Sequence, residues 1–126
     1  MENHSADIII IGGGLAGLVS AIHLSKSGLS VILIEKNEYP KHKVCGEYIS
    51  NEVLPYLQHL GADPMTTGAK KISRFLLSTT RGKTIETKLP LGGFGVSRYT
   101  LDRFLVQNAI KNNTVVIQDT VSDVHF

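Results

Sequence analysis

Two runs of branched apolar residues with a glycine cluster between them constrain the fold of this chain more than any other feature. The first run, residues 7–11, ends in four consecutive isoleucines. A run without polar alternation is typical of a strand buried on both faces of a parallel sheet. Apolar residues at helical spacing follow over residues 15–27, Gly28 ends that stretch, and residues 30–34 form the second run. This order predicts a β-α-β unit.

The glycines between the first strand and the helix have the spacing G-x-G-x-x-G, with Gly12, Gly14 and Gly17 at the three fixed positions. In this motif the first glycine allows a sharp turn, the second lets the backbone approach a pyrophosphate, and the third lets the helix pack closely. The helix N-terminus then presents free N–H groups to an anion. The alternative is a glycine-rich helix entry that serves packing alone, and the entropic cost of three adjacent glycines disfavours it.

Glu35 stands at the end of the second run, about 20 residues after the glycines, where the motif places an acid on a ribose. A carboxylate at that place accepts hydrogen bonds from ribose hydroxyls and repels a 2′-phosphate. The pattern therefore favours FAD or NAD as the ligand of this site and disfavours NADP.

Composition limits the remaining classes of function. A chain of 126 residues with a net charge of +2 suits one modest domain, and its scattered basic residues argue against nucleic acid as the main partner. Cys45 is the single cysteine, so nothing indicates an oxidising compartment. The polar start and the interrupted apolar run argue against a signal peptide and a membrane span. We predict a cytoplasmic protein without a metal site, because no spaced set of His, Cys and carboxylate residues occurs.

An insertion covering residues 35–96 is predicted between the second strand and the next helix of the sheet. Residues 36–47 are polar and include proline and glycine, which indicates a loop. Ser50 or Asn51 can cap a short helix that runs to Leu60. A detour of this length is unusual in a plain NAD-binding module with short connections.

The second half of the insertion reads as a β-hairpin. Residues 72–78 and 84–89 are rich in β-formers and are joined by a turn at residues 79–83. The second of these strands alternates apolar and polar residues, as a strand with one solvated face does. Residues 90–95 contain one proline and three glycines, which predicts a second glycine-rich loop.

The last third of the chain returns to the parallel sheet. Thr100 is a plausible cap for a helix over residues 101–111, with Asp102 in its first turn. Residues 114–117 then read as a third buried strand and residues 121–126 as the start of a fourth. The predicted fold is α/β: a Rossmann-like parallel sheet with an inserted helix and β-hairpin in the right-handed crossover after its second strand.

Three segments carry a resemblance to a known family. They are residues 7–18 with Glu35 and Lys36, then Lys43 to Gly46, then Ser97 to Leu105 with its Arg-x-x-Leu-Asp start. Over essentially the whole chain the sequence resembles FAD-dependent oxidoreductases of the geranylgeranyl reductase and p-hydroxybenzoate hydroxylase-like (flavin monooxygenase) superfamily.

The resemblance implies specific contacts with FAD. The pyrophosphate would lie at the glycine turn and helix start, and the adenosine ribose at Glu35. Lys43 and the Cys45-Gly46 loop would run beside the ribityl chain and flavin, with Cys45 a candidate for a chemical role. The full set of cofactor-binding residues that we predict is Gly12, Gly14, Leu15, Ala16, Gly17, Glu35, Lys36, Lys43, Arg98 and Val121.

The chain also departs from the family. Members carry a later Asp-Gly segment and a later Gly-Asp segment, and neither dipeptide occurs in these residues. We therefore expect residues 1–126 to be the N-terminal part of an FAD-binding domain, with the C-terminal remainder of the enzyme absent and the isolated fragment inactive.

Several of these residues have a plainer interpretation as well. Lys41 and His42 are expected in a solvated loop, and Lys43 fits either such a loop or an anion contact. Cys45 can be a small apolar packing residue, which is the usual role of buried cysteine. Arg98 can be a surface charge before the helix cap, although its place after the second glycine-rich segment favours a contact with the cofactor.

The predicted function is that of an FAD-dependent oxidoreductase, either a reductase or a monooxygenase. Its substrate would be a small isoprenoid, aromatic or polyketide-like molecule, with lipid-like compounds included, and NAD(P)H would act as a transient reductant. The alternatives are an NAD-binding dehydrogenase half and a catalytically inactive nucleotide-binding fragment. Flavin absorbance of the purified protein separates the first reading from both.

Overall fold

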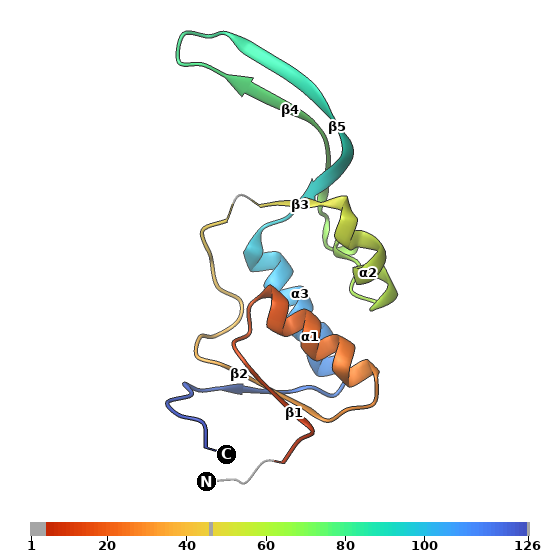
Figure 1. The fold of residues 1–126 in the computed structure, drawn as a ribbon, viewed down its shortest axis with the longest axis vertical. Coiled ribbons are helices and arrows are strands. Elements are labelled where there is room, and N and C mark those ends of the chain that lie inside the picture. The colour runs from red at the N-terminus through yellow and green to blue at the C-terminus, as the bar shows by residue number, and fades with distance from the viewer. Residues whose placement is uncertain (1–4, 46, 126) are drawn as a thin grey trace.

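The computed structural model describes residues 5–45 and 47–125. Its helices and strands are shown in Figure 1 and, in chain order, are β1 (Ile8–Ile11), α1 (Leu15–Lys26), β2 (Val31–Glu35), β3 (Tyr48–Ser50), α2 (Leu54–His59), β4 (Lys70–Ser78), β5 (Thr84–Gly95), α3 (Arg98–Lys111) and β6 (Val115–Gln118). Two 3-10 turns, Asn51–Val53 and Pro64–Thr67, flank α2.

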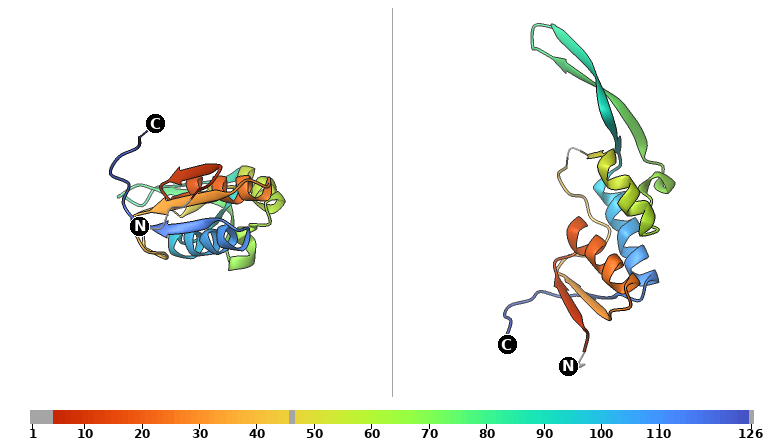
Figure 2. Two further views of the ribbon diagram at one scale, coloured as in Figure 1. Left: turned by 90° about the horizontal axis from the view of Figure 1, so that it is seen from below. Right: turned by 45° about the vertical axis from the view of Figure 1, so that its right-hand side comes forward.

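A three-stranded parallel sheet in the order β1-β2-β6 forms the base of the molecule. The chain moves one place along the sheet through α1 and one further place, in the same direction, through α3. Right-handed crossovers in one direction put both helices on the same face. Figures 1 and 2 show α1 and α3 side by side on that face. The predicted α/β fold with a Rossmann-like parallel sheet is confirmed.

The hydrophobic core lies between this face and the two helices. Its fully buried members include Leu18 and Ile22 of α1, Leu33 of β2, and Leu105 of α3. The inward-facing residues predicted for the last helix, namely Leu101, Leu105, Val106 and Ala109, are all buried. The core therefore fixes α1 and α3 against the sheet and holds the start of each helix in place.

The prediction that the first strand is buried on both faces is wrong for the described part of the chain. Ile9 is 59% exposed and Ile11 is 57% exposed, whereas Ile8 and Ile10 pack against the core. The two crossovers run in one direction, so they cover one face of the sheet. Val115 of β6 is exposed on the same open side, since it pairs in register with Ile32, the partner of Ile9.

The helix ends follow local sequence signals, with one correction. Gly28 ends α1 with a φ of +88°, as predicted. At the other helix, the predicted cap at Thr100 is wrong. Ser97 is the N-cap of α3, and its hydroxyl accepts a hydrogen bond from the Thr100 amide at 3.2 Å. Asp102 consequently lies beyond the first turn, where it faces inward.

The insertion forms a second, antiparallel sheet in the order β3-β5-β4. The prediction of a glycine-rich loop at residues 90–95 is wrong, because these residues continue β5, and Gly93, Phe94 and Gly95 pair with both neighbouring strands. Glycine is needed there for close strand packing. A Cβ on Gly93 would lie 2.5 Å from the Tyr48 ring and 2.5 Å from the Ile49 carbonyl oxygen. Phe94, between two such glycines, is fully buried.

The strands β4 and β5 extend beyond this sheet as a long hairpin arm, which projects away from the rest of the molecule (Figure 1). The predicted turn at residues 79–83 is confirmed, with Gly82 at a φ of +81°. Along the arm one face carries Phe75, Leu77 and Ile85, and the other carries Arg74 paired to Glu86 at 3.0 Å.

Two predicted elements differ from the structure. The expected helix to Leu60 begins as a 3-10 turn capped by Ser50, and β3 before it was not predicted. Within the described residues, 121–125 form no strand, since no neighbouring strand pairs with them. Residues 1–4, Gly46 and Phe126 lie outside the described residues.

Candidate functional site

The turn between β1 and α1 has the backbone geometry that the glycine spacing predicts. Gly12 has a φ of +101°, a conformation that side chains disfavour. A Cβ on Gly17 would lie 2.0 Å from the Gly12 carbonyl oxygen, so the helix can pack this closely on the turn only with glycine there. A Cβ on Gly14, in contrast, would meet nothing within 4 Å. The backbone at Gly14 is therefore open to a ligand.

The start of α1 offers hydrogen-bond donors that the described chain does not use. Gly14 is the N-cap and has no side chain to cap the helix, and the first turn contains no acidic residue. The first helical bond runs from the Leu18 amide to the Gly14 carbonyl oxygen at 2.9 Å. Within the described residues, the backbone amides of Gly14, Leu15, Ala16 and Gly17 have no acceptor. These donors and the positive end of the helix dipole fit an anion such as a diphosphate.

Glu35 ends β2 and directs its carboxylate to this turn. Oε2 accepts a hydrogen bond from the Gly13 amide at 2.8 Å. Oε1 accepts two from Asn37, one from its amide at 3.0 Å and one from its Nδ2 at 2.6 Å, and Lys41 Nζ lies 3.7 Å away. The residue is 8% exposed. The predicted acid is thus beside the glycine turn, with three hydrogen bonds already formed.

These contacts keep Glu35 ionised. Burial by itself raises the pKa of a carboxyl group, but the hydrogen bonds from Asn37 and Gly13 and the charge of Lys41 outweigh it, and they lower the pKa of Glu35 to about 2. At neutral pH the side chain is a carboxylate that can only accept hydrogen bonds. Such a group favours the hydroxyls of an unmodified ribose and repels a 2′-phosphate.

A cleft of about 310 Å³ adjoins Glu35 at the carboxyl ends of the parallel strands. Ligands of open α/β sheets bind at this edge. The residues that line the cleft come from the ends of β1, β2 and β6 and are Ile11, Gly12, Ile34, Glu35, Lys36, Asp119, Thr120 and Val121. The structure therefore brings Lys36 and Val121, both predicted from the resemblance, together with the glycine turn and the acid.

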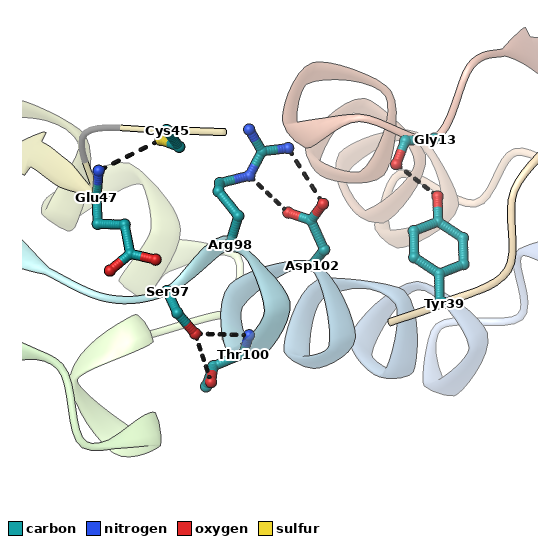
Figure 3. A network of polar contacts seen from close by, with 8 residues as sticks. All are labelled: Gly13, Tyr39, Cys45, Glu47, Ser97, Arg98, Thr100 and Asp102. Carbon is teal, nitrogen blue, oxygen red and sulfur yellow. Dashed lines mark hydrogen bonds and ion pairs between the residues drawn. The ribbon is translucent and has the colours of Figure 1, made fainter. Parts of the chain in front are cut away.

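Arg98, the first residue of α3, is held by a buried acid. Its Nε donates to Asp102 Oδ1 at 2.9 Å and its Nη2 donates to Asp102 Oδ2 at 3.1 Å (Figure 3). Asp102 is 1% exposed, and the Arg98 side chain is 14% exposed. The hydrogen bond to Asp102 raises the pKa of Arg98. The surface-charge interpretation of Arg98 is therefore wrong, and its guanidinium has a fixed orientation.

Tyr39 was not predicted and lies on the glycine turn. Its hydroxyl donates a hydrogen bond to the Gly13 carbonyl oxygen at 2.5 Å (Figure 3). Burial, together with the charges of Glu35 and Asp102, raises the pKa of Tyr39 and keeps it a donor. The sequence contains one signal for this contact. The G-x-G-x-x-G motif does not require glycine at position 13, so a glycine there indicates that some other group packs against it.

The loop between β2 and β3 is less solvated than predicted at one residue. Lys41 is partly buried and pairs with Glu35, so the solvated prediction is wrong for Lys41. His42 is exposed, as predicted, and its ring stacks on that of Tyr99 with centroids 4.7 Å apart. Cys45 is exposed rather than a packing residue, and its sulfur accepts a hydrogen bond from the Glu47 amide at 3.4 Å (Figure 3). Lys43 is exposed and, within the described residues, forms no hydrogen bond or ion pair.

Taken together, the fold and this edge of the sheet define a nucleotide-binding protein of the Rossmann-like class. A helix with unused N-terminal amides, an open glycine and an ionised acid at the next strand form the donor and acceptor set that a dinucleotide requires.

Comparison with known proteins narrows this class. Residues 7–46 match the family model described as FAD dependent oxidoreductase. A protein of Escherichia coli strain K12, described as a probable electron transfer flavoprotein-quinone oxidoreductase (YgcN), is 36% identical over 93% of this chain and 29% of its own length. Digeranylgeranylglycerophospholipid reductase 1 of Methanothermobacter thermautotrophicus is 27% identical over 92% of this chain and 30% of its own length.

The solved structures agree on the fold. The flavin-dependent brominase Bmp2 superposes with a TM-score of 0.80 at 24% identity, over 96% of this chain and 31% of that one. The resemblance seen in the sequence is confirmed: residues 7–46 match the FAD-dependent oxidoreductase model, and the chain is similar to a digeranylgeranylglycerophospholipid reductase and to a flavin-dependent halogenase. It spans 29% and 30% of the length of the two curated relatives named above.

Among the residues that the structure describes, no helix combines the length and apolar character needed to cross a bilayer. Among the same residues, no group of three or more His, Cys, Asp or Glu side chains is arranged to hold a metal ion.

Proposed function

We propose that this chain is the FAD-binding part of an FAD-dependent oxidoreductase. The observation that carries the proposal is the pairing of the open Gly14 backbone with the ionised Glu35 across one turn. FAD supplies hydride and electron transfer through its isoalloxazine ring, and the protein supplies binding, orientation and electrostatics.

Different residues bind different parts of the cofactor. The amides of Gly14, Leu15, Ala16 and Gly17 bind the pyrophosphate, and Gly12 shapes the turn that exposes them. Glu35 accepts hydrogen bonds from the adenosine ribose, with Lys36 and the backbone at Val121 lining the adenine side of the cleft. Arg98 reaches the cofactor from the start of α3, with Lys43 and Cys45 on the neighbouring loop.

The substrate is proposed to be a small isoprenoid, aromatic or polyketide-like molecule that is reduced or oxygenated. NAD(P)H would reduce the flavin transiently from outside the Glu35 site, because the carboxylate disfavours a 2′-phosphate there. The names of the relatives support a flavin-dependent reaction, and they include reductases as well as flavin-dependent halogenases. Location in the cytoplasm remains a prediction from the sequence.

The experiment that tests the proposal is a titration of the purified protein with FAD, followed by flavin fluorescence and absorbance. We expect saturable binding, competition by ADP, and much weaker competition by FMN, which lacks the adenosine half. Addition of a 2′-phosphate to ADP should weaken competition. Failure of both FAD and ADP to bind would overturn the assignment, and NAD binding without FAD binding would favour the dehydrogenase alternative.

A further inference from the structure

Gly13, the unconstrained position of the glycine motif, is fixed from both sides in this structure. Its amide donates to Glu35 Oε2 at 2.8 Å, and its carbonyl oxygen accepts the hydroxyl hydrogen bond of Tyr39. Gly13 is buried. A single residue therefore connects the strand-end acid to the turn that exposes the free amides.

Packing explains why this position is glycine. A Cβ on Gly13 would lie 1.6 Å from Tyr39 Oη, 2.9 Å from Tyr39 Cζ and 3.0 Å from Glu35 Cβ. The backbone itself does not require glycine, because the φ of Gly13 is outside the positive region. The clash comes mainly from Tyr39, so the tyrosine occupies the space that a side chain at position 13 would need.

Asn37 completes the arrangement on the other carboxylate oxygen. Its two hydrogen bonds and the nearby Lys41 ammonium all reach Oε1, while Oε2 receives the Gly13 amide. A carboxylate has about four acceptor positions, so one on Oε2, on the side of the turn, is left for a ligand hydroxyl.

We propose that Tyr39 and Asn37 are positioning residues that set the glycine turn and Glu35 in the conformation that binds the ADP half of the cofactor. The inference deepens the proposed function and rests on it. Tyr39 fixes the peptide group between Gly13 and Gly14, which contains the first free amide. Asn37 fixes the rotamer of the Glu35 carboxylate.

The energetic reason is preorganisation. A glycine-rich turn that samples several conformations loses entropy when it closes on a phosphate, and that loss lowers affinity. A hydrogen bond that holds the turn before binding removes part of the loss. Because one such bond contributes modestly, we expect Tyr39→Phe to weaken ADP binding about five-fold, with Asn37→Ala having an effect of similar size.

The test measures ADP affinity and thermal unfolding of the full chain for Tyr39→Phe and for a matched control. Tyr48→Phe is the control, since the Tyr48 hydroxyl donates to the Gly92 carbonyl oxygen at 3.2 Å in the other sheet. Both variants lose one tyrosine-to-glycine hydrogen bond. We expect weaker ADP binding in Tyr39→Phe alone, with similar changes in melting temperature for the two variants.

A second comparison tests whether position 13 and Tyr39 affect ADP affinity through one shared contact. Gly13→Ala should weaken ADP binding strongly beside Tyr39, because the methyl group would displace the ring. In a Tyr39→Ala background the same change should have little further effect on affinity. Asn37→Ala provides an independent variant on the loop if the tyrosine variants fail to fold.

The possible results distinguish a failure of the proposed function from a failure of the positioning role. Absence of ADP binding in the unmodified protein would overturn the proposed function and this inference together. Normal ADP binding in the unmodified protein, with equal affinities for Tyr39→Phe, Asn37→Ala and the Tyr48→Phe control, would overturn the positioning role alone.

Discussion

Replacing Glu35 by glutamine should remove a pH-dependent contribution to stability. The group has an ordinary pKa of 4.5 and a folded pKa of about 2, a difference that corresponds to ~3 kcal/mol. Because folding lowers the pKa, the contribution is fully present above pH 4.5 and is lost as the pH falls toward 2. At pH 7 we therefore expect Glu35→Gln to unfold more easily by ~3 kcal/mol.

The assay is urea unfolding of both proteins at pH 7, 5, 4 and 3, with the free energies extrapolated to water. The gap between the unmodified protein and Glu35→Gln should stay constant from pH 7 to about 5 and then narrow steadily. Asp7, whose pKa a hydrogen bond from Ser30 lowers, is unchanged in both proteins and cancels in the difference. Glu38→Gln, at an exposed neighbouring position, serves as the control and should alter stability little at any of these pH values.

A gap of the same size at pH 7 and pH 3 would refute the reasoning, since it would mean that the lost stability comes from packing and not from ionisation. A gap near zero at pH 7 would show that the hydrogen bonds of Asn37 and Gly13 do not stabilise the charged form.

Three further predictions concern the glycine turn, the buried ion pair of α3 and the cap of α3. Gly14→Ala should lower the free energy of unfolding by less than ~1 kcal/mol, through the poorer N-cap, but weaken ADP binding about ten-fold in a calorimetric titration, because the methyl group stands where a phosphate approaches. Gly17→Ala should instead cost ~1–3 kcal/mol of stability in urea unfolding, since its Cβ meets the Gly12 carbonyl. Asp102→Asn should lose ~2 kcal/mol of stability because it weakens a buried pair with Arg98, whereas Glu86→Gln on the exposed arm, which breaks the pair with Arg74, should lose less than ~0.5 kcal/mol; equal losses in urea unfolding would contradict this. Ser97→Ala should cost ~1 kcal/mol through the lost cap of α3, and an unchanged helix signal and melting temperature would show that the cap is dispensable.

The parts of the site that sequence predicts well are those that depend on near neighbours in the chain. Gly12 and Gly17 are required by the turn itself, and Glu35 follows from the length of one helix and one strand. The positions of all three could be inferred because the β-α-β unit is short and its crossover has one hand.

The parts that were missed depend on contacts between distant segments or on elements that interrupt local patterns. Tyr39 and Lys41 lie in a polar loop, and nothing in the local sequence shows that the loop folds back onto Gly13 and Glu35. Phe94 lies between glycines that favour a loop, yet strand pairing with Ile49 and Lys71 places it in the core. Exposure of Ile9 likewise follows from the direction of both crossovers, which the isoleucine run does not encode.

The most direct test of the central claim is a map of backbone amide chemical shifts in ¹⁵N-labelled protein during titration with ADP. We expect the largest changes on the amides of Gly12 to Gly17, on Glu35 and on Val121, with the β4–β5 arm unaffected. Binding with shifts confined to the arm or to the β3 region, and with the glycine turn unchanged, would contradict the assignment of this turn as the site of the cofactor diphosphate.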